Sequence, residues 1–148
     1  MASVKWEAGT DSTQLSTELN SLADLGQKIA TSAYDNTSGL YLFADVEWHN
    51  ASLGYTPSAG AVIELYLIRQ LLDGTANYED GDDSVAPPAA NLVGVFNIRA
   101  STSAQTHILR QIPIPPDKFK WLVINRTGGT LPSSGNTVRH KPLRYQTA

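Results

Sequence analysis

The chain has 148 residues, of which 41% are hydrophobic and 17% are charged, which is enough for one domain with a buried core. The absence of cysteine excludes disulfide bonds, thiolate metal sites and a cysteine nucleophile. No run of about 20 apolar residues is present that would cross a bilayer. The start "MASVKWEAGTDS" lacks a basic segment followed by an apolar one, so we expect a protein made in the cytoplasm, without a signal peptide and without a membrane partner.

The net charge of −3 hides an uneven distribution of charge along the chain. Residues 1–98 carry 3 basic and 13 acidic groups, whereas residues 99–148 carry 8 basic and 1 acidic group. Neighbouring strands with complementary faces would explain this, and so would acidic and basic patches that join copies of the chain or a larger assembly. Nucleic acid is not expected as a partner, because the basic residues are spread over several segments of an acidic chain.

The first 32 residues form an N-terminal element whose sequence is compatible with two different structures. Residues 13–32 are polar, with leucines at 15, 19, 22 and 25 in a helical spacing. Their Ser, Thr, Asn and Gly content favours instead an extended arm and first strand that becomes ordered on a partner. We therefore divide the chain into an arm or short helix over residues 1–32 and a β domain over residues 33–148.

Two segments have the alternation of a β-strand. In "LYLFADVEWH" from Leu40, the even-numbered residues to Trp48 are apolar and share one face, which leaves Asp45 and Glu47 on the other. In "AVIELYLIRQLL" from Ala61 both faces are apolar, which is typical of a central strand.

Residues 73–91 predict a long connection, because Gly, Pro and Asp interrupt every apolar period. Four further short strands follow, in "LVGVFNIRA", "HILRQIPI", "KFKWLVIN" and "NTVRHKPLRYQ". We expect a chain reversal at Pro113 to Pro116, a turn at Gly128-Gly129, and a last strand that carries its basic groups to an exposed edge. Short strands without βα alternation predict an all-β fold: a single antiparallel β-sandwich, jelly-roll-like.

The sequence contains no recognisable catalytic or metal-binding motif. The acidic segment 73–83 lacks the ligand spacing of a calcium-binding EF-hand, so it is interpreted as a solvated loop, with an ion site or a docking surface as alternatives. The histidines at 49, 107 and 140 have no metal-ligand spacing, and no nucleophile elbow or phosphate loop is present. We therefore expect no enzyme, no cofactor and no metal. Three N-glycosylation sequons, at Asn36, Asn50 and Asn125, are interpreted as chance matches.

The aromatic residues suggest one alternative function, a carbohydrate-binding module in which exposed rings stack on sugars. Trp48 and Trp121 alternate with apolar neighbours and are expected in the core. Trp6 lies in a polar leader, and we assign it to a contact between chains, with packing on its own domain as the alternative.

Four stretches carry a resemblance to a known group of proteins: "SLADLGQKIATSAYDNTSGLYLFADVEWHNASL", "TPSAGAVIELYLI", "DGTANYEDG" and "IPIPPDKFKWLVINRTGGTLPSSGNTVRHKPL". In this order they resemble small virion proteins encoded among the head genes of tailed bacteriophages, over roughly residues 13 to 145. The resemblance implies a head decoration (cement) protein that binds the major capsid protein on the outer surface of the mature head and stabilises contacts between capsomers. A neck or tail protein of the virion is the alternative within this class.

The resemblance also implies a homo-oligomer, a trimer rather than a dimer, located on the capsid surface. Contacts to the capsid or to other copies are expected at the arm, the acidic loop and the basic C-terminal segment. The residues concerned are Trp6, Leu15, Leu19, Asp80, Asp82, Asp83, Arg139, Lys141 and Arg144.

Overall fold

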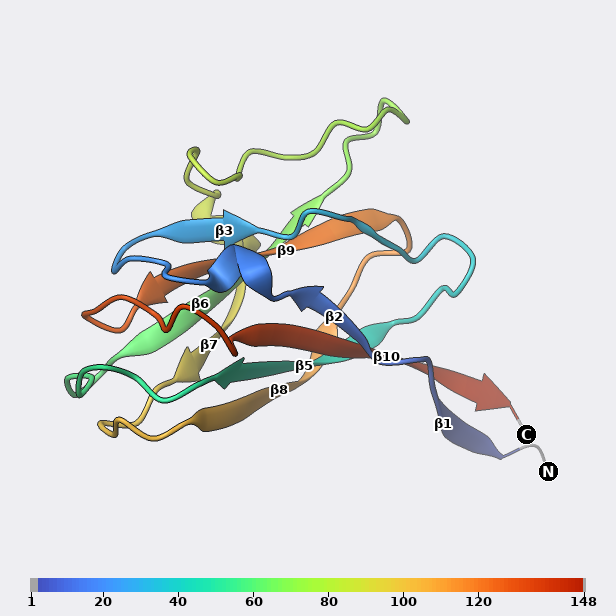
Figure 1. Ribbon diagram of the computed structural model, residues 1–148. Helices are drawn as coiled ribbons and strands as arrows, with labels where there is room; N and C mark the ends of the chain where they lie inside the picture. The colour runs from blue at the N-terminus through green and yellow to red at the C-terminus, as the bar shows by residue number, and fades with distance from the viewer. Residues whose placement is uncertain (1–2, 148) are drawn as a thin grey trace.

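The computed structural model describes residues 3–147, which fold into two antiparallel β-sheets packed face to face (Figure 1). The first sheet has the strand order β1-β10-β5-β8, with β2 also pairing with β10. Its strands are β1 (Val4–Ala8), β2 (Ser12–Leu15), β5 (Phe43–Asn50), β8 (Gln105–Pro113) and β10 (Thr137–Thr147). The all-β sandwich expected from the sequence is confirmed.

The second sheet has the order β3-β9-β6-β7, with β4 also pairing with β9. Its strands are β3 (Gln27–Ile29), β4 (Tyr34–Asp35), β6 (Val62–Arg69), β7 (Leu92–Asn97) and β9 (Lys118–Arg126). Two short 3-10 helices, η1 (Thr17–Leu19) and η2 (Ala89–Asn91), complete the structure. No helix within residues 3–147 is both long and apolar enough to cross a membrane.

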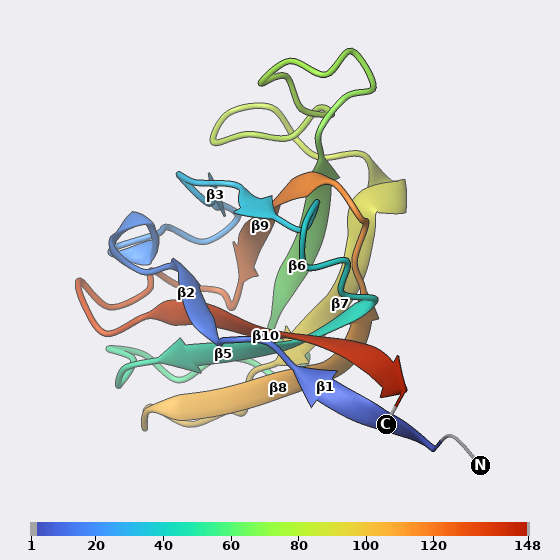
Figure 2. The same cartoon turned by 90° about the vertical axis from the view of Figure 1, so that its right-hand side faces the viewer.

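The strands pair from the two ends of the chain inward. β1 and β2 pair with β10, β3 and β4 with β9, β5 with β8, and β6 with β7. Each pair lies within one sheet, and successive pairs along the chain alternate between the two packed sheets (Figure 2). The chain is thus arranged as one long hairpin wrapped around the core, which is the strand order of a jelly roll.

The core lies between the sheets and follows the alternation of the sequence. Along β5 every second residue from Ala44 is buried, and Trp48 and Trp121 are fully enclosed, as predicted. The segment from Ala61 is a central strand, also as predicted, since β6 lies between β9 and β7. The outer face of the second sheet carries a second apolar cluster, formed by Tyr66 and Ile68 of β6 and Leu122 and Ile124 of β9, and flanked by Ile29 and Tyr78.

The strand predicted from Leu40 begins later, at Phe43. Leu40 has a φ of +47°, in the left-handed region, which an extended strand does not adopt. The cause is the side chain of Asn36, whose amide donates to the Tyr41 carbonyl at 2.8 Å and whose oxygen accepts from the Tyr41 N–H at 2.9 Å. These bonds hold residues 36–41 in a loop and leave Leu40 exposed.

The segment 13–32 forms neither a long helix nor a free arm, but the first strand that was expected as part of the second alternative is present as β2. It forms β2, η1 and β3, and it is part of the sandwich. Leu15 and Leu19 are 1% and 0% exposed and belong to the main core cluster. Their assignment as contact residues is therefore corrected: the first three leucines of the helical spacing, to Leu22, lie in the core without forming a long helix, whereas Leu25 is 65% exposed.

The basic last strand is not an edge strand, contrary to the expectation from its charge. β10 lies in the middle of the first sheet, with β5 on one side and β1 and β2 on the other.

The two predicted turns differ in their outcome. The connection from Pro113 to Pro116 does not form a hairpin, since it leads from β8 in the first sheet to β9 in the second. The turn at Gly128 is confirmed by its φ of +85°.

The three sequon asparagines are all buried, and each uses its side-chain amide within the fold. Asn50 accepts from the Trp48 Nε1 at 3.0 Å, and Asn125 donates to the carbonyls of Leu22, Ala23 and Gly129. They are structural residues that close loops, which agrees with interpreting the sequons as chance matches.

Candidate interaction surface

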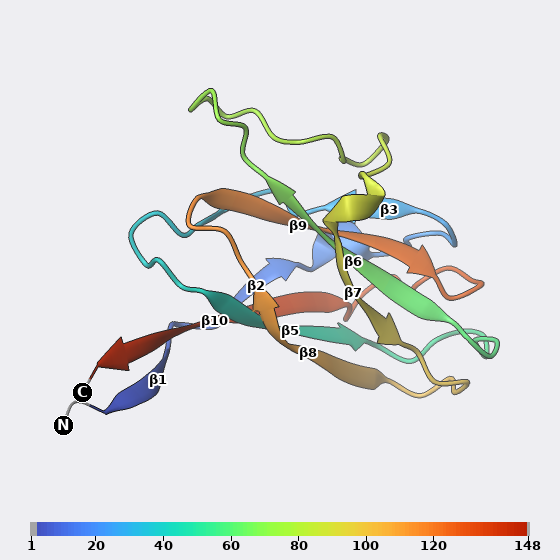
Figure 3. The same cartoon turned by 180° about the vertical axis from the view of Figure 1, so that it is seen from behind.

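A two-stranded ribbon extends from the sandwich where the two ends of the described chain meet. β1 pairs with the end of β10 from Val4↔Thr147 to Ala8↔Leu143, whereas the partner strand β5 begins only opposite Leu143. In Figures 1 and 3 this ribbon projects away from the packed sheets. Strands that extend beyond a core have one sheet face without a covering layer, and they need other contacts for stability.

One face of the ribbon, which we call the aromatic face, is formed by Trp6, Tyr145 and Phe43. Trp6 and Tyr145 are cross-strand partners with ring centroids 4.5 Å apart, and Phe43 lies 6.1 Å from Trp6 in an edge-on orientation. Trp6 is 46% exposed and Tyr145 is 50% exposed. Large aromatic rings that are held in place and remain half exposed are typical of protein–protein contact sites.

The opposite face of the ribbon is polar and fixes it to the domain. The Arg144 guanidinium donates to the Glu7 carboxylate at 2.6 Å and to the Gly39 carbonyl at 2.7 Å, and it lies over the Tyr41 ring at 5.1 Å. The hydrogen bond from Arg144 holds the pKa of Glu7 below its usual value. Arg144, predicted as a contact residue, therefore connects the ribbon to the loop before β5.

A charged depression of about 310 Å³ lies on the outer face of the first sheet. It is lined by Asp45 and Glu47 from β5, Ile108 and Arg110 from β8, Asp11, and Arg139, His140 and Lys141 from β10. The Arg110 Nη1 donates to Asp45 at 2.6 Å, and Arg139 pairs with Asp11. Within residues 3–147, Lys141 and Glu47 form no ion pair.

The depression adjoins the aromatic face, because Lys141 and Asp45 are each two residues from Leu143 and Phe43 on the same strands and the same side of the sheet. Asp45 and Glu47 lie outward, as the sequence predicted. The outer surface of the first sheet thus combines an apolar end with a charged centre.

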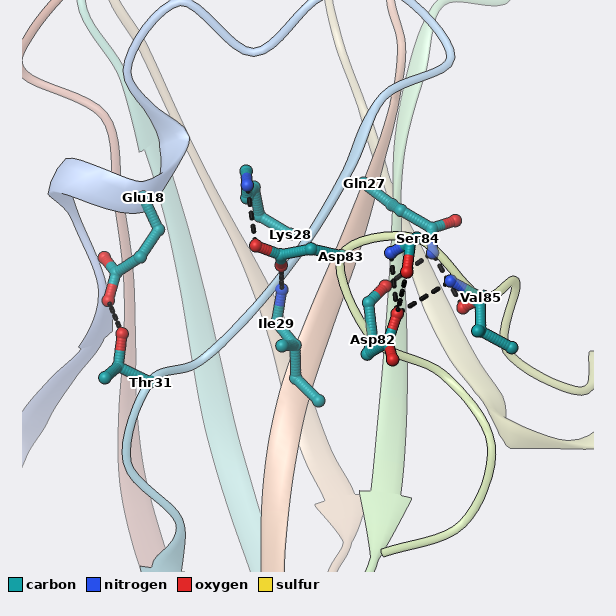
Figure 4. A network of polar contacts seen from close by, with 9 residues as sticks. All are labelled: Glu18, Gln27, Lys28, Ile29, Thr31, Asp82, Asp83, Ser84 and Val85. Atoms are coloured by element: carbon teal, nitrogen blue, oxygen red, sulfur yellow. Dashed lines mark hydrogen bonds and ion pairs between the residues drawn. The ribbon is translucent and has the colours of Figure 1, made fainter.

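The acidic loop lies elsewhere, against the edge of the second sheet (Figure 4). Asp83 accepts from the Lys28 Nζ at 2.6 Å and from the Ile29 N–H at 3.0 Å, and the Gln27 side chain donates to the Val85 carbonyl at 2.8 Å. Burial opposes ionisation of Asp83, but the hydrogen bonds from Lys28 and Ile29 outweigh it and lower its pKa.

Asp82 is bound to its own loop, since the N–H groups of Ser84 and Val85 donate to its carboxylate and lower its pKa. The loop therefore acts as an internal clamp that covers the free edge of β3. Of the three predicted contact residues in this loop, Asp80 has no hydrogen bond or ion pair to another described residue. No group of three or more potential metal ligands is brought together within the part of the chain that the structure describes.

The predicted contact residues thus separate into three places. The ribbon and β10 carry Trp6, Arg139, Lys141 and Arg144. The loop beside β3 carries Asp80, Asp82 and Asp83, and the core contains Leu15 and Leu19.

The sequence interpretation missed Tyr145 and Phe43. The signal was present in "VKWEA" and "LRYQ", where apolar and polar residues alternate, but each stretch is short and its partner lies at the other end of the chain.

The uneven charge of the sequence is explained by strand pairing. Five of the seven ion pairs join a basic residue of 99–148 to an acidic residue of 1–98: Arg110–Asp45, Lys118–Asp35, Arg126–Glu64, Arg139–Asp11 and Arg144–Glu7. Because the strands pair from the two ends inward, the acidic and basic parts of the chain face each other within one domain. Complementary neighbouring strands, the first of the two explanations above, account for the asymmetry.

Sugar stacking has little support in the geometry of the exposed rings. A carbohydrate platform requires coplanar rings, whereas Trp6 and Tyr145 are inclined at 43° and Trp6 and Phe43 at 61°. The rings pack on one another and offer no common plane.

Comparisons with known proteins do not assign the chain to a family. No family model and no curated protein matches the sequence. Among solved structures, the chain is similar to Desmodium yellow mottle tymovirus with a TM-score of 0.38 and 11% identity, over 100% of this chain and 89% of that chain. It is also similar to the arabinose-bound α-L-arabinofuranosidase MgGH51 with a TM-score of 0.34 and 11% identity, over 95% of this chain and 23% of that chain.

Proposed function

We propose that this protein is a structural component of a bacteriophage virion, a decoration or cement protein that attaches to the outer surface of the head. The proposal is carried by the aromatic face of the ribbon, which a rigid sandwich holds away from its own core. It is supported by the resemblance of the sequence to phage head-gene products. In this proposal the partner is the major capsid protein, the location is the virion surface after synthesis in the host cytoplasm, and no catalysis is involved.

The physical basis of attachment is the burial of preorganised rings. Trp6 and Tyr145 are fixed by cross-strand pairing and by Phe43, so docking them costs little conformational entropy. The charged depression next to them would set the orientation of the protein on the shell. Many copies bound to a repetitive lattice would then add up to a large total stabilisation of the shell.

The experiment is co-sedimentation of the purified protein with phage heads that lack it. We expect Trp6→Ala combined with Tyr145→Ala to weaken attachment by about tenfold or more, because anchors of this kind dominate interfaces. Leu72→Ala is the matched control, since Leu72 is 100% exposed in the loop after β6 and lies away from the ribbon. Full occupancy of heads by the double variant would refute attachment through the aromatic face.

Wild-type protein that does not bind heads at all would refute the decoration function itself. Binding only to isolated necks or tails would support the alternative position in the virion. Binding to a glycan array without binding to heads would support the carbohydrate-binding alternative.

A further inference from the structure

The outer edge of β1 is a strand edge without a partner among residues 3–147. The Gly9 N–H donates to the Pro142 carbonyl at 2.8 Å, so Gly9 turns its backbone groups toward β10. Because these groups alternate in direction along an antiparallel strand, Glu7 and Lys5 also turn toward β10. The N–H and C=O groups of Val4, Trp6 and Ala8 therefore point to the free edge.

This edge is complementary to itself. If two copies of β1 pair in antiparallel orientation about a two-fold axis at Trp6, then Lys5 lies opposite Glu7 of the second copy, and Glu7 lies opposite Lys5. Val4 and Ala8 pair across the same axis. The opposite charges fall in non-hydrogen-bonded positions, where cross-strand side chains come closest.

The two adjacent two-fold registers are less favourable. An axis at Lys5 places two lysines opposite each other, and an axis at Glu7 does the same with two carboxylates, which repel. The charges of "VKWEA" thus select the register centred on Trp6.

We infer that β1 is a dimerisation edge, through which two copies of this chain pair to form one sheet that continues from β8 of one copy to β8 of the other. Exposed edge strands normally avoid such pairing, and a lysine is a usual means of doing so. In the paired state, the Glu7 carboxylate of one copy would compensate the positive charge of Lys5 in the other copy.

Edge pairing would use a surface different from the aromatic face. The hydrogen-bonding edge would bind the second copy, while the rings of both copies would remain on one side of the joined sheet. The inference is independent of the proposed function, because it concerns the protein alone in solution. It favours a dimer, not the trimer that the sequence resemblance implies.

The first test is the mass of the purified protein measured by light scattering and sedimentation at rising concentration. We expect a dimer at about 100 μM, since an interface of one short strand pair is small and belongs to the weaker class. A wild-type protein that stays monomeric, or that forms a trimer, would overturn the inference.

The second test exchanges charges between copies. Lys5→Glu alone places two carboxylates opposite each other at both charged pairs of the dimer, and Glu7→Lys alone places two ammonium groups there, so each variant is expected to be monomeric. An equal mixture of the two variants restores opposite charges at both pairs and is expected to form a heterodimer at wild-type concentrations. Dimers of equal strength in the separate variants would contradict the register.

The third test removes an edge donor without touching the pairing to β10. Ala8→Pro eliminates an N–H that points to the free edge, and proline is tolerated on the open side of an edge strand. We expect self-association to weaken by about tenfold or more, because two symmetry-related hydrogen bonds are lost. Ala8→Val, which keeps the N–H, should dimerise as the wild type does. Unchanged dimerisation of a folded Ala8→Pro variant, with folding checked by circular dichroism, would exclude pairing through this edge.

Discussion

The Nε1 of Trp121 donates a hydrogen bond of 2.9 Å to the Nδ1 of His140, and this bond joins the two sheets through the centre of the core. His140 is only 1% exposed, and its ring is surrounded by Tyr34, Phe119 and Trp121. Because Nδ1 accepts, the neutral imidazole carries its proton on Nε2, which has no hydrogen-bond partner within residues 3–147. Burial lowers the pKa of His140 to about 4.

This burial predicts a specific pH dependence of stability. In the unfolded chain His140 takes up a proton near its usual pKa of 6.5, whereas the folded protein resists protonation down to about pH 4. The contribution of the neutral ring is therefore complete above pH 6.5 and is lost as the pH falls from 6.5 to 4. We expect the unfolding free energy of the wild type to fall by about 3 kcal/mol more than that of His140→Gln over this range.

Urea denaturation of both proteins at pH 7, 5.5 and 4 measures this difference. Glutamine keeps an acceptor for Trp121 but does not titrate, so the comparison isolates the imidazole. Stability curves that run parallel over this pH range would show that the folded protein accommodates the charged ring.

Asn125 is predicted to be a major determinant of stability. Its amide donates to three backbone carbonyls, and its oxygen accepts from the Thr127 N–H at 3.1 Å and hydroxyl at 2.7 Å. Asn125→Ala leaves buried groups without partners and should reduce the unfolding free energy by about 3 kcal/mol. Asn77→Ala, in an exposed loop, is the control and should change it by less than about 0.5 kcal/mol.

Gln111 offers a substitution that should stabilise the fold. It has a φ of +54° at the register shift between β8 and β5, and its N–H donates to the Asp45 carboxylate at 2.9 Å. Glycine adopts this conformation without strain, so Gln111→Gly should raise the unfolding free energy by about 1 kcal/mol. The control Gln146→Gly in β10 should instead lower the unfolding free energy by about 0.5 to 1 kcal/mol. A decrease in both variants would show that the backbone at Gln111 is not strained.

The clamp on β3 can be tested by hydrogen exchange. Asp83→Ala removes the acceptor for the Ile29 N–H and the partner of Lys28, so the Ile29 amide should exchange faster. Global stability should change by less than about 1 kcal/mol, since both charged groups are partly exposed. Asp80→Ala should leave the exchange unchanged, and equal protection of Ile29 in both variants would show that the loop does not cover this edge.

The sequence predicts the parts of the fold whose signal is local. The alternation in β5, the two apolar faces of β6 and the burial of Trp48 and Trp121 all follow from neighbouring residues. The first 35 residues could not be predicted in the same way, because β1 to β4 are short and gain their structure from β9 and β10 far along the chain. The same holds for the aromatic face, which joins Trp6 to Tyr145.

The inward pairing of the strands has a consequence for the order of folding. Contacts between β6 and β7 close the shortest stretch of chain, and each further pair encloses the one before it, so we expect ordered structure to spread from this central hairpin toward the two ends. The pairing of β1 with β10 would form last and fray first. The ribbon of β1 and the end of β10 would then be the least cooperative part of the molecule.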